Sequence, residues 1–184
     1  ADIKTVLAAK TITTAADVDA TVDGVISAAD ANTISGATTG TVTATVAAGT
    51  AAALNKALVN ANGTLVTGDN LTLTISKGTA AAADLIALDN KTLVNVKANE
   101  VTTITGNAAD VLTALTATTI DTAADVAATV SGTVSAADAR LIAATTTGKV
   151  TATVTAADAG TLVTALTDTD VNAYKLTVSG TTAT

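Results

Sequence analysis

Three short segments decide the fold: Thr14-Ala-Ala-Asp17-Val18, Ser27-Ala-Ala-Asp30 and Val42-Thr-Ala-Thr-Val46. Each recurs 108 residues later, as Thr122-Ala-Ala-Asp125-Val126, Ser135-Ala-Ala-Asp138 and Val150-Thr-Ala-Thr-Val154. Over the stretches 11–46 and 119–154, 25 of 36 positions are identical. A match of this length indicates an internal repeat, which is typical of proteins that stack one structural unit on the next.

A shorter pattern inside the repeat combines a residue that can cap a helix, two alanines and an aspartate. The side-chain oxygen of Ser, Thr or Asn accepts from N–H groups of the first helical turn, and an Asp three residues later favours the positive end of the helix. We therefore predict a short helix after each of six caps, with a structural role for each Asp. The pairs are Thr14 and Asp17, Ser27 and Asp30, Asn107 and Asp110, Thr122 and Asp125, Ser135 and Asp138, and Thr155 and Asp158.

Between these predicted helices, short segments alternate apolar and polar residues, which is typical of β-strands. They are 42–46, 71–75, 150–154 and 174–178. Period two places Val42, Ala44 and Val46 on one face, which we expect under the helices, and Thr43 and Thr45 on the other. Further strands are expected to end at Ile12, Ile26, Ile104, Ile120 and Val134.

The spacing of the strands predicts how they connect. A strand, one helix and another strand within so short a length form a crossover unit, which gives parallel neighbours and is right-handed in nearly all proteins. Residues 1–184 are therefore predicted to form a single repeat domain, a right-handed β/α solenoid with one parallel sheet and one layer of short Ala-rich helices. Its architecture alone is similar to that of leucine-rich repeats. The halves 11–46 and 119–154 are related, whereas turn residues such as Gly68 and Asp69-Asn70 make 47–100 irregular, with extra turns or hairpins.

The composition excludes many functions. Of 184 residues, 44 are Ala and 42 are Thr, while Cys and His are absent, so thiol chemistry, disulfides and the usual zinc or haem sites are excluded. The formal net charge of −7 argues against nucleic acid and anionic membrane as partners. The remaining candidates for catalysis, such as Glu100 and Tyr174, show no spacing that pairs a nucleophile with a base, so no enzyme is expected.

No cofactor is expected either. Acidic turns such as Asp69-Asn70, Asp89-Asn90 and Asp168-Thr-Asp170 offer oxygens that calcium would accept. No stretch supplies the spaced acidic loop of a known calcium motif, so calcium binding remains without a motif to support it. Asx turns and solvated edges explain these residues more simply.

The Ser/Thr-Ala-Ala-Asp helix starts, the turns Thr38-Thr39-Gly40 and Thr146-Thr147-Gly148, and the Val-Thr-Ala-Thr-Val strands together carry a resemblance. They resemble the Ala/Thr/Val-rich tandem repeats of very large secreted bacterial surface proteins, notably cyanobacterial adhesins and haemolysin-type calcium-binding proteins. The resemblance implies an extracellular, structural or adhesive role in a long repetitive polypeptide. The calcium-binding nonapeptide of such proteins, G-G-x-G-x-D, does not occur in this sequence, so calcium does not transfer with the resemblance.

Two hypotheses for the function remain. The first is a non-enzymatic structural module at the cell surface, part of a fibre, sheath, surface layer or adhesin stalk, whose partners are itself, adjoining repeats or a cell-surface or matrix component, without membrane insertion. The second is a binding module, either for carbohydrate through 47–100 or for ice through an exposed array of threonines. Those threonines are Thr43, Thr45, Thr72, Thr74, Thr151 and Thr153. The simpler explanation for them is that Thr is a polar residue with a high strand preference.

Overall fold

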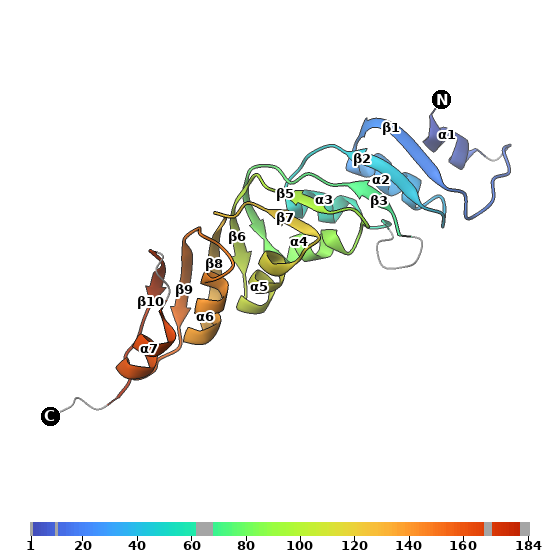
Figure 1. Ribbon diagram of the computed structural model, residues 1–184. Coiled ribbons are helices and arrows are strands. Elements are labelled where there is room, and N and C mark those ends of the chain that lie inside the picture. Colours follow the sequence, from blue (N-terminus) through green and yellow to red (C-terminus); the bar gives the residue numbers. More distant parts are fainter. Residues whose placement is uncertain (1, 10, 62–67, 168–170, 181–184) are drawn as a thin grey trace.

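The computed structural model describes residues 2–9, 11–61, 68–167 and 171–180. The chain has a mixed α/β architecture and forms an elongated body with its two ends far apart (Figure 1). The described residues contain seven helices: α1 (Ile3–Ala8), α2 (Ala28–Ser35), α3 (Ala51–Ala57), α4 (Ala82–Asp89), α5 (Ala108–Thr116), α6 (Ala136–Ala143) and α7 (Ala159–Ala165). Each helix contacts the next one along the chain, so the helices form one continuous row.

The strands alternate with the helices. They are β1 (Ala20–Ile26), β2 (Val42–Val46), β3 (Asn70–Thr72), β4 (Gly78–Ala81), β5 (Val96–Ala98), β6 (Val101–Gly106), β7 (Ile120–Thr122), β8 (Ala127–Val134), β9 (Val150–Val154) and β10 (Ala173–Lys175). Every strand pair among the described residues is parallel. The prediction of parallel strands connected through short helices is therefore confirmed.

The strands form three sheets where the sequence predicts one. Their orders are β1-β2-β3, β10-β9-β8-β6-β4 and β5-β7. Thr74, two residues after the end of β3, forms a single parallel bridge with Lys97 of β5. This bridge connects the first sheet to the third. The single predicted sheet is thus divided at the middle of the chain, because the strands there are only three or four residues long.

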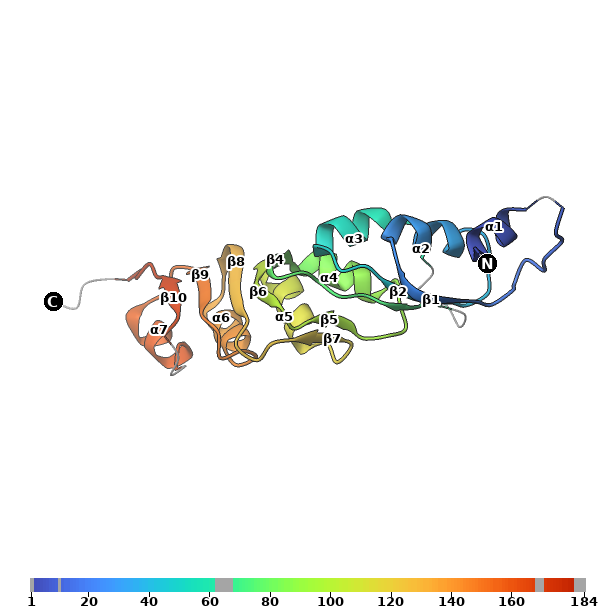
Figure 2. The ribbon, with the colours of Figure 1, turned by 90° about the horizontal axis from the view of Figure 1, so that it is seen from above.

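The core follows the predicted alternation. Val42, Ala44 and Val46 are buried on one face of β2, whereas Thr43 and Thr45 are exposed on the other. The same core contains Ala, Val, Leu and Ile from every part of the body, in one cluster. In Figure 2, α1 to α3 lie on one side of the strands and α5 to α7 on the opposite side, so the row of helices winds around the long axis.

Three of the six predicted caps open helices at the expected residue. Ser27, Asn107 and Ser135 are the N-caps of α2, α5 and α6, and each side-chain oxygen accepts from the amide of the Asp three residues later, at 2.9 to 3.0 Å. In return, the carboxylates of Asp30, Asp110 and Asp138 accept hydrogen bonds from these cap side chains. Each cap residue and its Asp therefore form two hydrogen bonds with one another.

The other three predicted helix starts are wrong. No helix follows Thr14 or Thr122; the backbone instead turns at Asp17 and at Asp125. The reason is tertiary, since the Ala16 and Ala124 carbonyl oxygens, which a helix would use internally, accept hydrogen bonds from the Thr39 and Thr147 amides of the Thr-Thr-Gly turns. The helix expected after Thr155 begins later, at Ala159, because Asp158 is itself the N-cap and accepts from the Thr161 amide at 2.9 Å. Thr155 donates to the Val134 carbonyl of the neighbouring strand.

Three helices have starts that the pattern does not predict. Thr50 caps α3 without a following Asp, Asp2 caps α1, and α4 has no side-chain hydrogen bond at its N-cap, Ala81. Stretch 47–100 therefore continues the alternation of helices and parallel strands, and no antiparallel hairpin occurs among its described residues. Ile12 also departs from the prediction, because it lies in a bend and not in a strand.

The structural repeat is half as long as the sequence repeat. Helices α2, α4 and α6 begin at Ala28, Ala82 and Ala136, two successive steps of 54 residues. Gly24, Gly78 and Gly132 follow the same step, and all three have a positive φ, which favours glycine. The middle unit is therefore a diverged copy of the first and third, with Leu85 and Leu88 buried where α6 has Ala139 and Ile142.

Candidate interaction surfaces

The predicted Thr array falls on two separate sheets. Thr43 and Thr45 on β2 are exposed, and the neighbouring Thr72 and Thr74 are half-buried. Thr151 is exposed and Thr153 half-buried, on β9. The structure therefore brings four of the six residues together and places the other two in the five-stranded sheet.

Rows of Thr do run across strands. In the five-stranded sheet, Thr105, Thr129 and Thr151 lie opposite one another on three successive strands, and Ala173 continues the row. In the first sheet, Asn70 follows Thr21 and Thr43 in the same row. Irregular register at Gly24 and Gly132 interrupts the neighbouring rows. The rows are therefore short and do not form one flat lattice.

A second feature is a set of buried or partly buried hydrogen bonds from Thr side chains to the backbone of an earlier segment, and we call it the Thr clasp. Thr38 Oγ1 donates to the carbonyl of Val18 at 2.6 Å, and its repeat counterpart Thr146 donates to that of Val126 at the same distance. Thr92, midway between them, donates to the Leu71 carbonyl at 2.8 Å and accepts from the Leu71 amide at 3.0 Å. The clasp residues Thr38, Thr92 and Thr146 thus recur at every 54-residue step, and each binds the backbone of a segment 20 or 21 residues earlier in the chain.

Asp69 was a candidate for an acidic turn, but its side chain lies in the core. It is 2% exposed, and its carboxylate accepts from the Ser35 hydroxyl at 2.8 Å and the Val42 amide at 2.9 Å. These bonds fix the end of α2 and the start of β2. Asp89 accepts from the Thr119 hydroxyl, and Asp19 accepts from the Thr41 amide. Each of these carboxylates therefore also binds a segment that lies 22 or 30 residues later in the chain.

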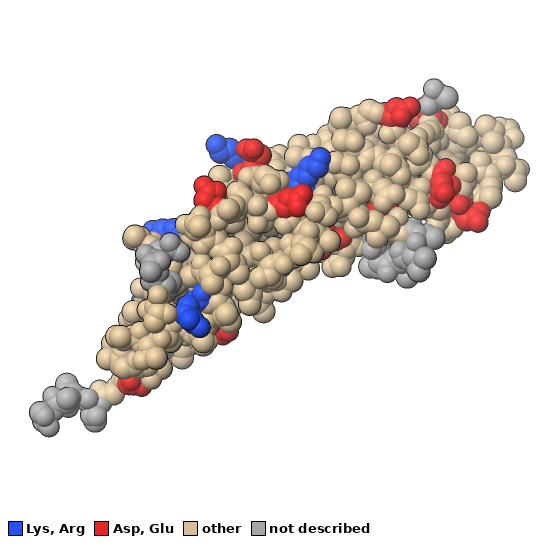
Figure 3. Space-filling view, viewed as in Figure 1, with Lys and Arg blue, Asp and Glu red and all other residues tan. Residues whose placement is uncertain are grey.

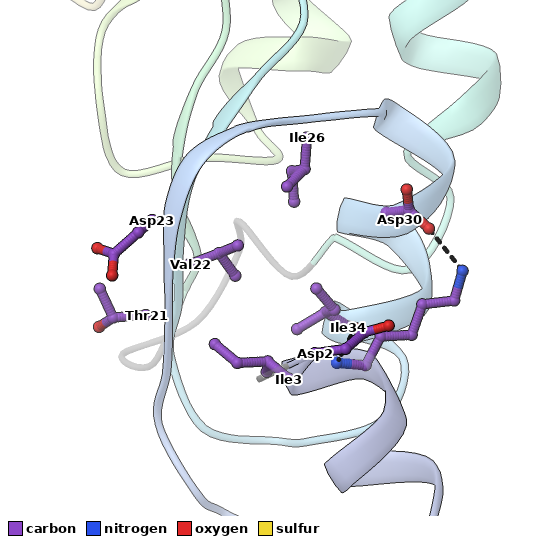
Figure 4. Close-up of a pocket in the computed structure, with 9 residues that line it drawn as sticks. Asp2, Ile3, Thr21, Val22, Asp23, Ile26, Asp30 and Ile34 are labelled. Carbon is purple, nitrogen blue, oxygen red and sulfur yellow. Dashed lines mark hydrogen bonds and ion pairs between the residues drawn. The ribbon is translucent and has the colours of Figure 1, made fainter.

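A cavity lies at the N-terminal end, between α1, β1 and α2 (Figure 4). It measures about 410 Å³, and its apolar lining includes Ile3, Val22 and Ile34. Asp2, Asp23, Asp30 and Lys4 supply its charges. A second, more apolar cavity of about 220 Å³ lies under the same helix, between Val6 and Leu7 of α1 and the start of β1. Helix α1 is thus separated from the open edge of β1 by two cavities.

One ion pair crosses the larger cavity. Lys4 Nζ lies 2.5 Å from Asp30 Oδ1, and both side chains are about half exposed. The hydrogen bond that Asp30 accepts from Lys4 is the main cause that lowers the pKa of Asp30, and the one from Ser27 comes second. The hydrogen bond between Lys4 and Asp30 also raises the pKa of Lys4. An exposed pair of this kind orients α1 against α2 and contributes little to stability.

Other site classes have less support in the structure. Among the described residues, no group of three or more carboxylates is placed to hold a metal ion. Asp168 and Asp170 lie outside the described residues. In the part of the chain that the structure describes, no helix has the length and apolar character needed to cross a bilayer. No family model, curated protein or solved structure matches this chain.

Proposed function

We propose that this chain is a non-enzymatic structural module, built as a right-handed β/α solenoid, that forms part of a fibre, sheath, surface layer or adhesin stalk outside the cell. A rung of this solenoid is one helix together with the strands before it. The single observation that carries the proposal is the order of the contacts. Each helix contacts the next helix, and most strands pair with a strand from the neighbouring rung. A body built this way lengthens by adding rungs.

The proposed handedness rests on general chain geometry. Connections between parallel strands of one sheet are right-handed in about 98% of known cases. The helices here provide such connections between β1 and β2, between β4 and β6, and between β8 and β9. The isolated bridges at Thr74 and Gly49 support the view that the three sheets belong to one ribbon.

The hydrogen bonds of the polar residues support a structural role over catalysis. The carboxylates of Asp30, Asp110 and Asp138 accept hydrogen bonds from the N-cap side chains of their helices. Asp158 caps α7, and Asp69 holds two elements together inside the core. Among the described residues, no buried side-chain nitrogen or oxygen lacks a hydrogen-bond partner. A carboxylate already engaged in this way is a poor general base, so we propose no enzymatic activity and no cofactor.

The proposed partners are adjoining repeats or further copies of the chain. The open β1 edge and the exposed apolar residues near β10 support this choice. The net charge of −7 supports neither nucleic acid nor an anionic membrane as partner. The proposed extracellular location rests on the resemblance to tandem repeats of secreted bacterial surface proteins.

Two measurements test the proposal. Small-angle X-ray scattering of the purified chain should give an elongated particle with a narrow cross-section; a compact particle would refute the solenoid. Antibodies raised against the chain should label intact cells of the source organism. Labelling that requires permeabilised cells would refute the surface location.

Ice binding is the second candidate, and the row Thr105, Thr129 and Thr151 favours it. Such rows present hydroxyl and methyl groups at the strand spacing of about 4.8 Å. Thermal hysteresis should be measured on the wild type and on a variant with Thr43, Thr45, Thr151 and Thr153 changed to Lys. No hysteresis in the wild type, or none lost in the variant, would eliminate this function.

A further inference from the structure

The glycines that recur at the 54-residue step follow residues of different chemistry. These glycines have a positive φ and are Gly24, Gly78 and Gly132. The residues directly before them are Asp23, Lys77 and Ser131. Asp23-Gly24 is the only Asp-Gly pair in the sequence. One of three equivalent positions therefore has a carboxyl group directly before a glycine.

The backbone around Asp23 and Gly24 is not held in the ladder between β1 and β2. Between two regular pairs, residues 22–24 of β1 together oppose Ala44 alone. Such an excess is a β-bulge, whose extra residues lack ladder partners. Asp23 and Gly24 are both exposed, and a Cβ atom on Gly24 would meet no described heavy atom within 4 Å. In Figure 4, the Asp23 side chain points to the opposite side of β1 from Val22.

The same bulge inside the molecule shows that this exposure does not depend on the open edge of β1. Residues 130–132 of β8 together oppose Ala152 of β9, and β8 has β6 on its other side. Ser131 and Gly132 are nevertheless exposed, and a Cβ atom on Gly132 would also meet no described heavy atom within 4 Å. A bulge at this step of the repeat therefore stays open with strands on both sides.

The carboxyl group of Asp23 is not engaged by another side chain. Among the described residues, no hydrogen bond or ion pair holds it, whereas Asp30 is held by both Ser27 and Lys4. On the face shown in Figure 3, the charged side chains at the N-terminal end are all acidic. A side chain without partners changes rotamer freely, so the carboxyl group of Asp23 can reach the peptide nitrogen that follows it.

We propose that Asp23 is a site of spontaneous isomerisation to isoaspartate, a covalent modification of the main chain. The Gly24 amide nitrogen attacks Cγ of the protonated carboxyl group, a C–N bond forms, and the carboxyl hydroxyl leaves as water with the amide proton. The cyclic imide then takes up water. Cleavage of the new C–N bond restores aspartate, whereas cleavage at the backbone carbonyl leaves the main chain running through Cγ. No oxidant, metal or partner takes part.

Glycine favours this reaction because it has no Cβ atom to crowd the attacking nitrogen, and a branched side chain crowds it most. Asp17 and Asp125 are also exposed and lie in turns, but valine follows each of them. They are therefore matched references for an exposed aspartate without glycine. We expect Asp23 to react several-fold faster than either.

Ageing of the purified chain tests the proposal. After incubation at mildly acidic pH, isoaspartate in proteolytic peptides is labelled with isoaspartyl methyltransferase and measured by mass spectrometry. The peptide with Asp23 should contain several-fold more isoaspartate than those with Asp17 or Asp125. Asp23→Glu should remove the signal, because glutamate would have to close a larger ring. Equal labelling of the three peptides would overturn the proposal.

Two designed Asp-Gly pairs separate the effect of the bulge from that of the sequence. Ser131→Asp creates a pair in the β8 bulge and should react as fast as Asp23. Thr122→Gly creates one in β7, where both residues pair with β5 and Asp121 accepts from Asn95 at 3.0 Å, so it should react slowly.

The same three sites should react at similar rates in urea, where no ladder protects them. Circular dichroism melting before and after incubation checks that each variant stays folded. Equal rates at the two designed sites in the folded protein would show that the bulge has no role and would overturn the proposal. The reaction needs no partner, so its failure would leave the proposed structural role unchanged.

Discussion

Gly148 lies at the tightest backbone contact of the Thr clasp. A Cβ atom at this position would overlap the backbone carbonyl groups of Asp125 and Val126, and the Val126 carbonyl is held in place by its hydrogen bond from Thr146. We predict that Gly148→Ala lowers the free energy of unfolding by about 1–3 kcal/mol, because overpacking forces the two turns apart. Urea denaturation measures this change.

The matched control is Gly160 in α7. The nearest atom to an added Cβ there is Asp158 Oδ1, at 3.3 Å, and the helical backbone suits alanine. Gly160→Ala should be neutral or stabilise the protein by up to about 1 kcal/mol. If both variants were destabilised equally, the contact at Gly148 would have no special role.

Thr92 tests the hydrogen bonds of the clasp without a change in size. Its buried hydroxyl accepts from the Leu71 and Val94 amides, at 3.0 and 3.1 Å. Thr92→Val retains the shape but leaves the Leu71 amide without this partner, so the free energy of unfolding should fall by about 1–3 kcal/mol. Thr92→Ser should recover most of it. Thr43→Val, at an exposed strand position, should change stability by less than about 0.5 kcal/mol, and a larger loss there would show that the assay does not isolate the clasp.

At the scale of single elements, Asp158 makes the stability of α7 depend on pH. The hydrogen bonds from the Thr161 hydroxyl and amide lower the pKa of its carboxyl group. A lowered pKa in the folded state stabilises the fold above the unfolded value of about 3.9, and this contribution is lost as the pH falls through the folded pKa. Carbon-13 chemical shifts of the carboxyl groups should show a lower midpoint for Asp158 in the wild type than in Thr161→Val. Equal midpoints would contradict this assignment.

The helix starts also show how far sequence alone could lead. Ser27 and Ser135 cap helices as the local pattern predicts, because every hydrogen bond of the cap lies within three residues. Thr14 and Thr122 carry nearly the same pattern, yet the chain turns there, since the Thr39 and Thr147 amides from 23 residues further on bind the Ala16 and Ala124 carbonyls. Local rules cannot detect such a competitor. A comparison of positions would have shown that Thr-Thr-Gly follows the Thr-Ala-Ala-Asp at 14–17 and at 122–125, but not the one at 155–158, which leads into α7.

The same limit applies to the acidic residues. Asp69 has the sequence context of a turn, but its partners Ser35 and Val42 lie 34 and 27 residues away. The 54-residue step is hard to find in the sequence because the middle unit retains Gly78 and Asp84 but has Leu85 in place of Ala31 and Ala139, and Leu88 in place of Ile34 and Ile142.

At the scale of the whole molecule, the stacked rungs predict that the chain can be lengthened without redesign. Residues 28–135 span two 54-residue steps, from the start of α2 to the cap of α6. A second copy of this stretch inserted after Ser135 recreates the Ser-Ala-Ala-Asp start at one junction and retains it at the other. It also brings the turn at Asp125 against a Thr-Thr-Gly turn, as in the native chain.

We predict that this insertion variant folds in one cooperative transition, because each helix contacts the next and the new neighbours of each proposed rung are equivalent to the old. The insertion adds four rungs, and at about 4.8 Å per parallel strand the maximum dimension should rise by roughly 20 Å on the sheet side, with an unchanged cross-section. X-ray scattering measures both dimensions. A control with 28–135 inserted after Ala52, inside α3, breaks the helix row and should lose cooperativity. If the first variant instead thickened, or unfolded in two separate steps, the rungs would not be equivalent and the solenoid architecture would be wrong.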